Sequence, residues 1–187
     1  ASGKSAIHMV SAWATANCVS LGQLVVDAKS NEITAIPKLL EMLEIAGSLV
    51  TIDAMGCQTE IAKTIIDGGG DYVLAVKGNQ PTLHDGIARF FDTHLESDFS
   101  GGCVSQHRTE EKAHGRVENR YYAVCPLQDD LPDAARWAGL KAIGIAISDT
   151  MRDGTNHCHV RYYILSQRLS AKTFGAAVRQ HWSIENR

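Results

Sequence analysis

Two short apolar segments constrain the fold more than any other feature of this sequence. They are Ser48–Asp53, an apolar run that ends in an aspartate, and Tyr72–Val76, and a predicted helix from Thr59 to Asp67 lies between them, ended by Gly68-Gly69-Gly70. Runs of this kind are typical of strands that are covered on both faces. A strand, a short helix and a second strand in this order predict part of an α/β sheet, and if the two strands are parallel they end at the same side of it.

The preceding residues extend the same sheet. Ile7–Ala14 and Leu21–Val26 predict two strands of a hairpin joined around Asn17. Apolar residues at helical spacing predict a helix over Ile33–Leu43, in which Pro37 requires the regular helix to begin close to it. The order β-β-α-β-α-β therefore predicts a mixed sheet with helices.

The pattern changes after a predicted helix from Leu83 to Leu95. Glycine-rich turns then alternate with three candidate strands, which are expected to pair antiparallel: Val117–Val124, Lys141–Ser148 and Cys158–Ser166, the last two joined around Asp153-Gly154. A final helix begins near Ser170. We therefore expect a core over residues 1–97, a β-rich insertion over residues 98–169, and a core helix over residues 170–187.

Composition excludes few functions. The formal charge of −3 gives no general attraction to a polyanion, so binding to nucleic acid would have to depend on local basic patches. Five cysteines without a CxxC motif predict free thiols, mostly buried. No apolar run approaches the roughly 18 residues of a membrane span, and no signal peptide is visible, so we expect a cytoplasmic protein without a membrane partner.

Two acids occupy unusual positions. Asp53 follows the first apolar strand, where ligands of α/β sheets gather. Glu185 falls on the apolar stripe of the last helix, formed by Phe174, Ala177, Val178 and His181. A buried carboxylate requires a metal, a cation or a proton. The alternatives are that Asp53 caps a turn or helix, and that Glu185 is solvated or pairs with Arg179 or His181.

Polar residues at two loops could bind phosphate. Lys77, Asn79 and Gln80 leave the second strand, at the same end of the sheet as Asp53 if the two strands are parallel, and could hold DNA phosphates or simply close a turn. Lys29 and Asn31 precede a helix whose N-terminus could face a phosphate, although ordinary helix capping explains them equally well.

Further candidates lie in the last helix and the insertion. Arg179 and Trp182 lie off the apolar stripe and could bind phosphates or stack on bases, or could serve only in packing. Arg116 begins a charged strand that could reach DNA or form a solvated edge. His157-Cys158-His159 resembles a metal site, but strand alternation sends the cysteine to the face opposite the histidines.

Five motifs resemble one known family, in that family's order along nearly the whole chain: Lys29-Ser30-Asn31-Glu32-Ile33, Thr51–Gln58, Lys77-Gly78-Asn79-Gln80, His114-Gly115-Arg116 and Arg179–Asn186. The family is the insertion-sequence DDE transposases of the H-repeat-associated branch. The resemblance implies a ribonuclease H-like catalytic core with a β-rich insertion, in which Asp53 and Glu185 are the second and third metal-binding acids.

The resemblance also implies an activity. Mg²⁺ or Mn²⁺ would support phosphodiester cleavage and strand transfer on DNA, with transposon ends and target as partners and a homodimer forming on the DNA. In this family the first catalytic aspartate lies in an Asp-Gly-Lys motif on a strand upstream of the segment that begins here with Ala1.

We therefore expect the chain by itself to be catalytically incomplete. We also expect a gap between the hairpin and the Asp53 strand, where the first strand of such a sheet would lie. Two alternatives remain. The chain could be an inactive remnant that serves as a DNA-binding or interaction module, or it could belong to a related metal-dependent nuclease.

Overall fold

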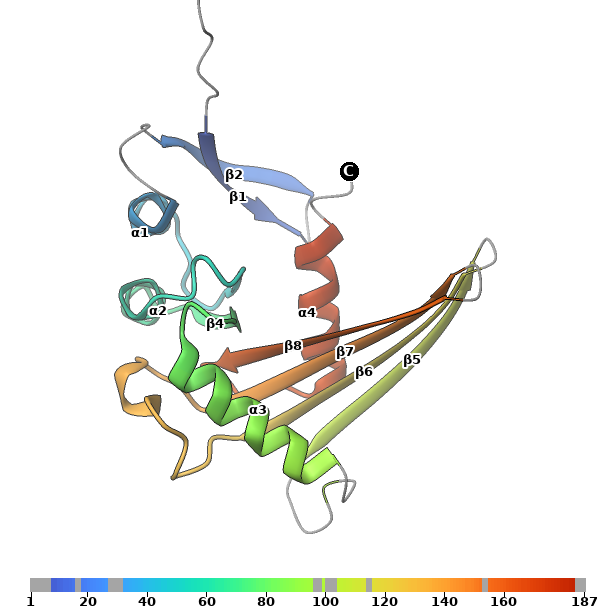
Figure 1. Cartoon of the computed structure of the whole chain (residues 1–187). Coiled ribbons are helices and arrows are strands. Elements are labelled where there is room, and N and C mark those ends of the chain that lie inside the picture. Colours follow the sequence, from blue (N-terminus) through green and yellow to red (C-terminus); the bar gives the residue numbers. More distant parts are fainter. Residues whose placement is uncertain are drawn as a thin grey trace, which may run out of the picture.

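A computed structural model describes residues 8–15, 18–26, 32–95, 99, 104–113, 116–152 and 155–183. Within these ranges the chain forms two sheets (Figure 1). A two-stranded hairpin pairs β1 (His8–Ala14) with β2 (Val19–Val26), as predicted. The larger sheet has six strands in the order β3-β4-β8-β7-β6-β5.

Parallel and antiparallel pairs are combined in the six-stranded sheet. β3 (Leu49–Ile52) and β4 (Asp71–Val76) run parallel, which settles the orientation that the sequence left open. All other pairs are antiparallel, and they join β5 (Ser105–Ala113), β6 (Arg116–Pro126), β7 (Ala142–Arg152) and β8 (Thr155–Leu165). Because β8 pairs with β4, the antiparallel strands extend the same sheet.

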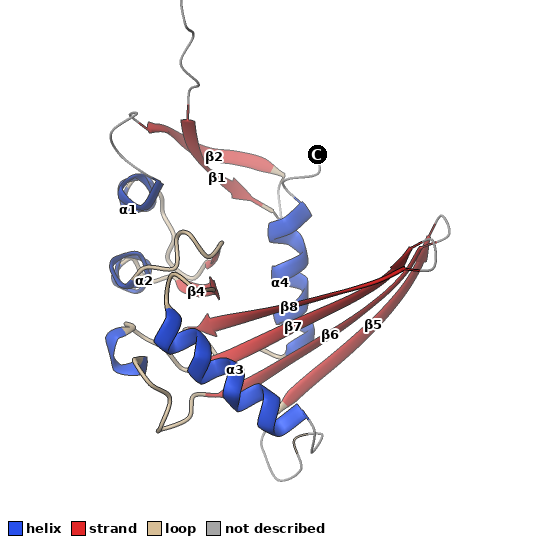
Figure 2. Cartoon of the chain, in the orientation of Figure 1, coloured by secondary structure: helices blue, strands red, loops and turns tan. Residues whose placement is uncertain are grey.

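The helices form a layer on each face of this sheet (Figure 2). The cluster on one face contains buried residues of α1 (Glu32–Glu41), α2 (Thr59–Asp67) and α3 (Pro81–Leu95). A second cluster, on the other face, contains Phe174 and Val178 of α4 (Ala171–Ser183). One 3₁₀ turn, η1 (Ala134–Arg136), lies between β6 and β7. The predicted α/β class, a mixed sheet with helices, is confirmed, and the antiparallel strands that were predicted as an insertion belong to this same sheet.

Local departures from the predictions have clear physical reasons. Helix α1 begins at Glu32, five residues before Pro37, so the proline lies inside the helix and removes one backbone hydrogen bond there. Strand β5 was not predicted, because its residues, Ser105–Ala113, are polar on both faces. Its position at the edge of the sheet explains this composition, since charged side chains protect exposed strand edges.

The cysteines are less buried than expected. Cys57 and Cys125 are buried free thiols, and burial raises the pKa of each to about 12, whereas Cys18 and Cys158 are exposed. Cys103 lies outside the described residues. In the part of the chain that the structure describes, no helix is long and apolar enough to cross a membrane.

Candidate active site and nucleic-acid interface

Asp53 is the first residue after β3, and a tight loop fixes its position. The backbone N–H of Gly56 donates to Asp53 Oδ1 at 3.3 Å, which closes the loop on the carboxylate. Gly56 itself is buried against the end of the strand: a Cβ there would lie 2.3 Å from Ile52 Cγ2. Asp53 remains half-exposed, with one oxygen engaged by its own loop.

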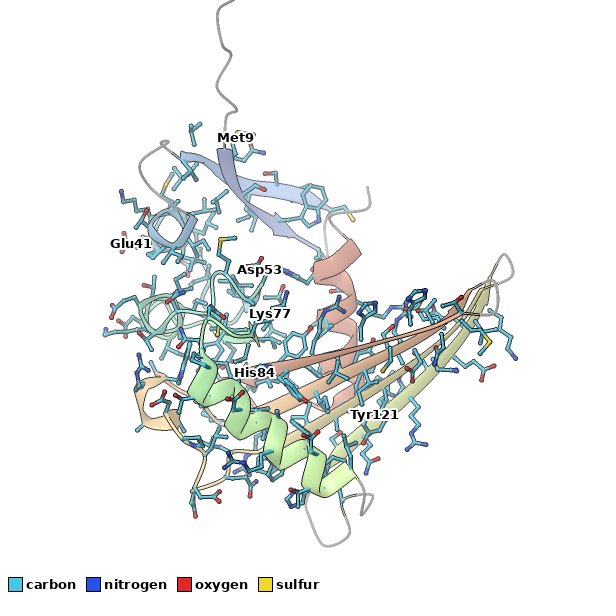
Figure 3. All side chains as sticks on the ribbon, in the orientation of Figure 1. Met9, Glu41, Asp53, Lys77, His84 and Tyr121 are labelled. Carbon is cyan, nitrogen blue, oxygen red and sulfur yellow. The ribbon has the colours of Figure 1, made fainter. Side chains whose placement is uncertain are left out.

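The loop after β4 holds the loop after β3. Asn79 Nδ2 donates to the carbonyl of Ala54 at 2.6 Å, and Gln80 Nε2 donates to the carbonyl of Cys57 at 3.0 Å. These two amide groups therefore position the Asp53 loop, and their predicted contact with DNA stays a prediction. The parallel pairing of β3 and β4 brings exposed Lys77 to the same end of the sheet as Asp53 (Figure 3).

Helix α4 packs against the strand that carries Asp53. Phe174 is fully buried, Val178 is nearly so, and Ala177 and His181 are half-buried, so the predicted apolar stripe faces the sheet. At the end of the stripe, His181 Nδ1 is hydrogen-bonded to Thr51 Oγ1 at 3.2 Å, two residues before Asp53. Sequence reasoning missed this contact, although a histidine on an otherwise apolar stripe was a signal that it needs a polar partner.

The guanidinium of Arg179 binds a carboxylate of the antiparallel strands. Both of its terminal nitrogens donate to Glu111, one of them at 3.1 Å. Arg120 donates to the same carboxylate at 3.0 Å and to Glu118 at 2.7 Å. The two arginines hold the pKa of Glu111 below its usual range, with the Arg179 hydrogen bond as the largest cause. Arg179 would have to exchange Glu111 for a phosphate in order to bind DNA.

Several predicted site residues cannot be placed. Glu185, Lys29 and Asn31 lie outside the described residues. The backbones of Trp182 and Arg116 belong to α4 and β6, but their side chains are outside what the structure describes.

The described residues do not by themselves complete a metal centre. Within their ranges no group of three or more His, Cys, Asp or Glu side chains could hold an ion. Asp53 is a hard oxygen donor, half-exposed and located at a strand end, so it suits Mg²⁺ or Mn²⁺ as one ligand of a larger set.

These features define a class: a mixed α/β protein, compatible with the ribonuclease H-like fold, with an acid at the end of a parallel strand and a helix packed beside it. Sequence comparison identifies the family. A model of the transposase DDE domain matches residues 1–187. The chain belongs to this transposase family, as the resemblance indicated.

Individual relatives agree with the family. Putative transposase YncI of Escherichia coli O157:H7 is 45% identical over 190 residues, which cover 98% of this chain and 47% of that protein. The H repeat-associated putative transposase YhhI of E. coli K12 is 41% identical over 189 residues, which cover 98% of this chain and 49% of that protein. The chain thus spans about half the length of these relatives. No solved structure matches significantly.

Proposed function

We propose that this chain forms part of the catalytic core of a DNA transposase, which cleaves phosphodiester bonds of an insertion sequence and transfers the cut strand. Asp53 and Glu185 would act as two of its acidic metal ligands. The single observation that carries the proposal is the hydrogen bond between Thr51 and His181. It joins α4 to the strand that immediately precedes Asp53, and Glu185 follows His181 by four residues in the sequence.

A divalent ion fits this end of the sheet chemically. Carboxylate oxygens are the ligands that Mg²⁺ prefers, and Asp53 lies where parallel strands end, the usual location of ligand sites in α/β sheets. When bound, such an ion would lower the pKa of a water or hydroxyl nucleophile and stabilise negative charge on phosphate oxygens.

The protein's own residues would position the reacting groups. Asn79 and Gln80 hold the Asp53 loop through two backbone carbonyls, so the carboxylate is fixed before DNA arrives. Lys77, at the same end of the sheet, carries a positive charge that suits a neighbouring phosphate.

The same proposal includes an additional strand between the β1–β2 hairpin and β3. The hairpin forms a sheet of its own among the described residues, and β3 pairs with β4 alone there. A ribonuclease H-like sheet would have its first strand in this interval, and that strand would bring the first catalytic aspartate beside Asp53.

A plasmid-nicking assay tests the proposal. The substrate is a supercoiled plasmid that carries the gene and its flanking DNA, and the protein is used as its gene encodes it. We expect nicking that requires Mg²⁺ or Mn²⁺ and falls at least a hundredfold in Asp53→Asn and in Glu185→Gln. The matched control, Asp129→Asn, changes an exposed acid in a turn and should cut normally.

The outcomes separate the alternatives. Undiminished cutting by both acid variants would refute the proposed site. Metal-dependent nicking without joining of the cut ends to a second DNA would point to a nuclease. DNA binding without any cutting by the wild-type protein would point to an inactive remnant that serves as a DNA-binding module.

A further inference from the structure

The outer half of β8 carries a column of side chains that the site above does not use. His157, His159 and Arg161 occupy alternate positions of this strand, so they project from the same face of the sheet. Both histidines are exposed, and Arg161 is half-buried. The cysteine between the histidines, Cys158, projects from the other face. The tripeptide is therefore no metal site by itself, but its two histidines lie on the same surface.

The packing of the inner half of β8 shows which face this is. Tyr163 lies edge-on against Phe174 of α4, with ring centroids 5.2 Å apart. Tyr162, the next residue in the strand, stacks on Phe91 of α3 instead. Because Tyr163 has the same parity as Arg161, His159 and His157, the column lies on the α4 face of the sheet.

Asp53 lies on this same face. In β3 the side chain of Ile52 packs in the cluster with α3, whereas Thr51 contacts His181 of α4. Asp53 is two residues after Thr51, so the alternation of side chains along the strand assigns it to the same face as Thr51. In the neighbouring strand, Val76 pairs with Tyr162, and this register, extended by one residue, brings Lys77 level with Arg161. A continuous series therefore begins beside Asp53 and continues outward through Lys77 and Arg161 to the two histidines.

The backbone along this path is also accessible. β4 pairs with β8 only at Tyr162–Leu165, so within the described chain the stretch Thr155–Val160 has a strand, β7, on one side only. Figure 1 shows this part of the sheet projecting beyond α3 and α4. Peptide N–H groups of such an edge are suitable donors to phosphate oxygens.

Apart from Asp53, the described acids of this face near the column are already neutralised. Its described carboxylates near the column, Glu111 and Glu118, are bound by Arg120 and Arg179. Asp149 and Glu110, by contrast, belong to the opposite face, where they line a shared hollow with Arg108. The α4 face therefore has positive charge and hydrogen-bond donors beside the candidate site, although the chain as a whole carries a charge of −3.

We propose that the column His157, His159 and Arg161, with Lys77 at its inner end, binds the backbone of double-stranded DNA that leads away from the bond to be cut. The proposal depends on the proposed function for the nature of the ligand. From His157 to Arg161 the strand rises roughly 13 Å, which equals the axial rise of about four nucleotides of one DNA strand. The column is therefore long enough to face up to about four phosphates of one strand.

DNA binding without metal tests this surface. Fluorescence anisotropy of a labelled 20-base-pair duplex would be followed between about 50 and 200 mM KCl in EDTA, with the protein as its gene encodes it. The variant combines His157→Gln, His159→Gln and Arg161→Gln. We expect about tenfold weaker binding at 100 mM KCl, and a plot of log K against log salt that is flatter by about 1 to 2.

A matched control removes cations from the opposite face of the same sheet. Arg108→Gln with Lys112→Gln deletes two full charges from β5 on the α3 side, so it should weaken binding by less than about threefold if location matters. If the triple variant has a lowered melting temperature, the double variant His157→Gln/His159→Gln replaces it, because both histidines are exposed, and it should weaken binding more than the control variant does.

The results are decisive in either direction. The proposed DNA-binding surface would be refuted by equal losses of DNA affinity in the triple variant and the control, by unchanged affinity of the triple variant, or by absence of binding by the wild-type protein. Normal nicking by Asp53→Asn together with tenfold weaker binding by the triple variant would refute the proposed function and support the DNA-binding surface. Loss of nicking in Asp53→Asn together with unchanged binding by the triple variant would refute the surface alone.

Discussion

Replacement of Gly56 by alanine should destabilise the protein and displace Asp53. The new Cβ would lie 2.3 Å from Ile52 Cγ2 and 3.1 Å from Ile36 Cδ1, whereas carbon atoms in ordinary contact are about 3.5–4.0 Å apart. Ile52 cannot yield easily, because its Cγ2 is attached directly to a β-branched Cβ with a restricted rotamer. The loop must therefore move by about 1 Å or more, and the Gly56 N–H that binds Asp53 moves with it.

The cost follows from measured overpacking in protein interiors. Such insertions destabilise by about 1–3 kcal/mol, and the lower entropy of the unfolded alanine chain offsets only about 0.4–1 kcal/mol of this. For a protein of this size, a net loss of about 1.5 kcal/mol lowers the melting temperature by about 3–6 °C. Thermal unfolding followed by circular dichroism measures this change directly.

Gly78 provides the matched control, since it lies in the facing loop and a Cβ at this position would have no heavy atom within 4 Å beyond the adjacent residues of the chain. Gly78→Ala should leave the melting temperature unchanged or raise it slightly. Plasmid nicking should fall with Gly56→Ala and persist with Gly78→Ala. If Gly56→Ala melts at the wild-type temperature and cuts DNA normally, the loop does not hold Asp53 in the way that the structure indicates.

Two further predictions concern the links between strands and helices. Ser166→Ala should cost about 1–3 kcal/mol in urea unfolding, because Ser166 is fully buried and its Oγ accepts the backbone N–H of Tyr72 at 2.7 Å, which the variant leaves without a partner. The pKa of Glu111 is lowered by Arg179 and Arg120, so its ion pairs stabilise the fold above the ordinary glutamate pKa of about 4.3 and lose this effect as the pH falls through the lower folded value. Glu111→Gln should therefore reduce the fall in melting temperature between about pH 5 and pH 3.

Exposed residues of the same type serve as controls for both. Ser48→Ala should unfold at nearly the wild-type urea concentration, and Glu60→Gln should keep the acid sensitivity of the wild-type protein. A Ser166→Ala variant as stable as Ser48→Ala would show that the buried hydroxyl is not the link between β8 and β4. Identical acid profiles of Glu111→Gln and the wild-type protein would show that the Arg179 pair contributes nothing to stability.

Hydrophobic pattern predicted the inner part of this fold because burial determines it. The bounds of α2, Thr59–Asp67, and the presence of a strand on each side of it followed from apolar runs and from the glycines after the helix. The outer half of the sheet was predicted less well. Its strands are longer than their apolar portions, and β5 has no apolar face at all, so strand pairing rather than burial stabilises it.

The candidate site was likewise predicted only in part. Asp53 and Lys77 were expected at one end of the sheet, and the parallel register of β3 and β4 places them there. The partners of Asn79, Gln80 and Arg179 could not be predicted, because each contact joins segments far apart in the sequence. A polar side chain in a turn or on a helix surface has the same local pattern whether it binds a backbone carbonyl, a carboxylate or a phosphate.

The central claim is that Asp53 and Glu185 hold a divalent ion together, and a crystal of the protein soaked in Mn²⁺ tests it most directly. Anomalous scattering locates manganese independently of any activity. The account predicts a peak bonded to carboxylate oxygens of both Asp53 and Glu185, and loss of that peak in Asp53→Asn. A peak elsewhere, with both carboxylates ordered and free of metal, would contradict it.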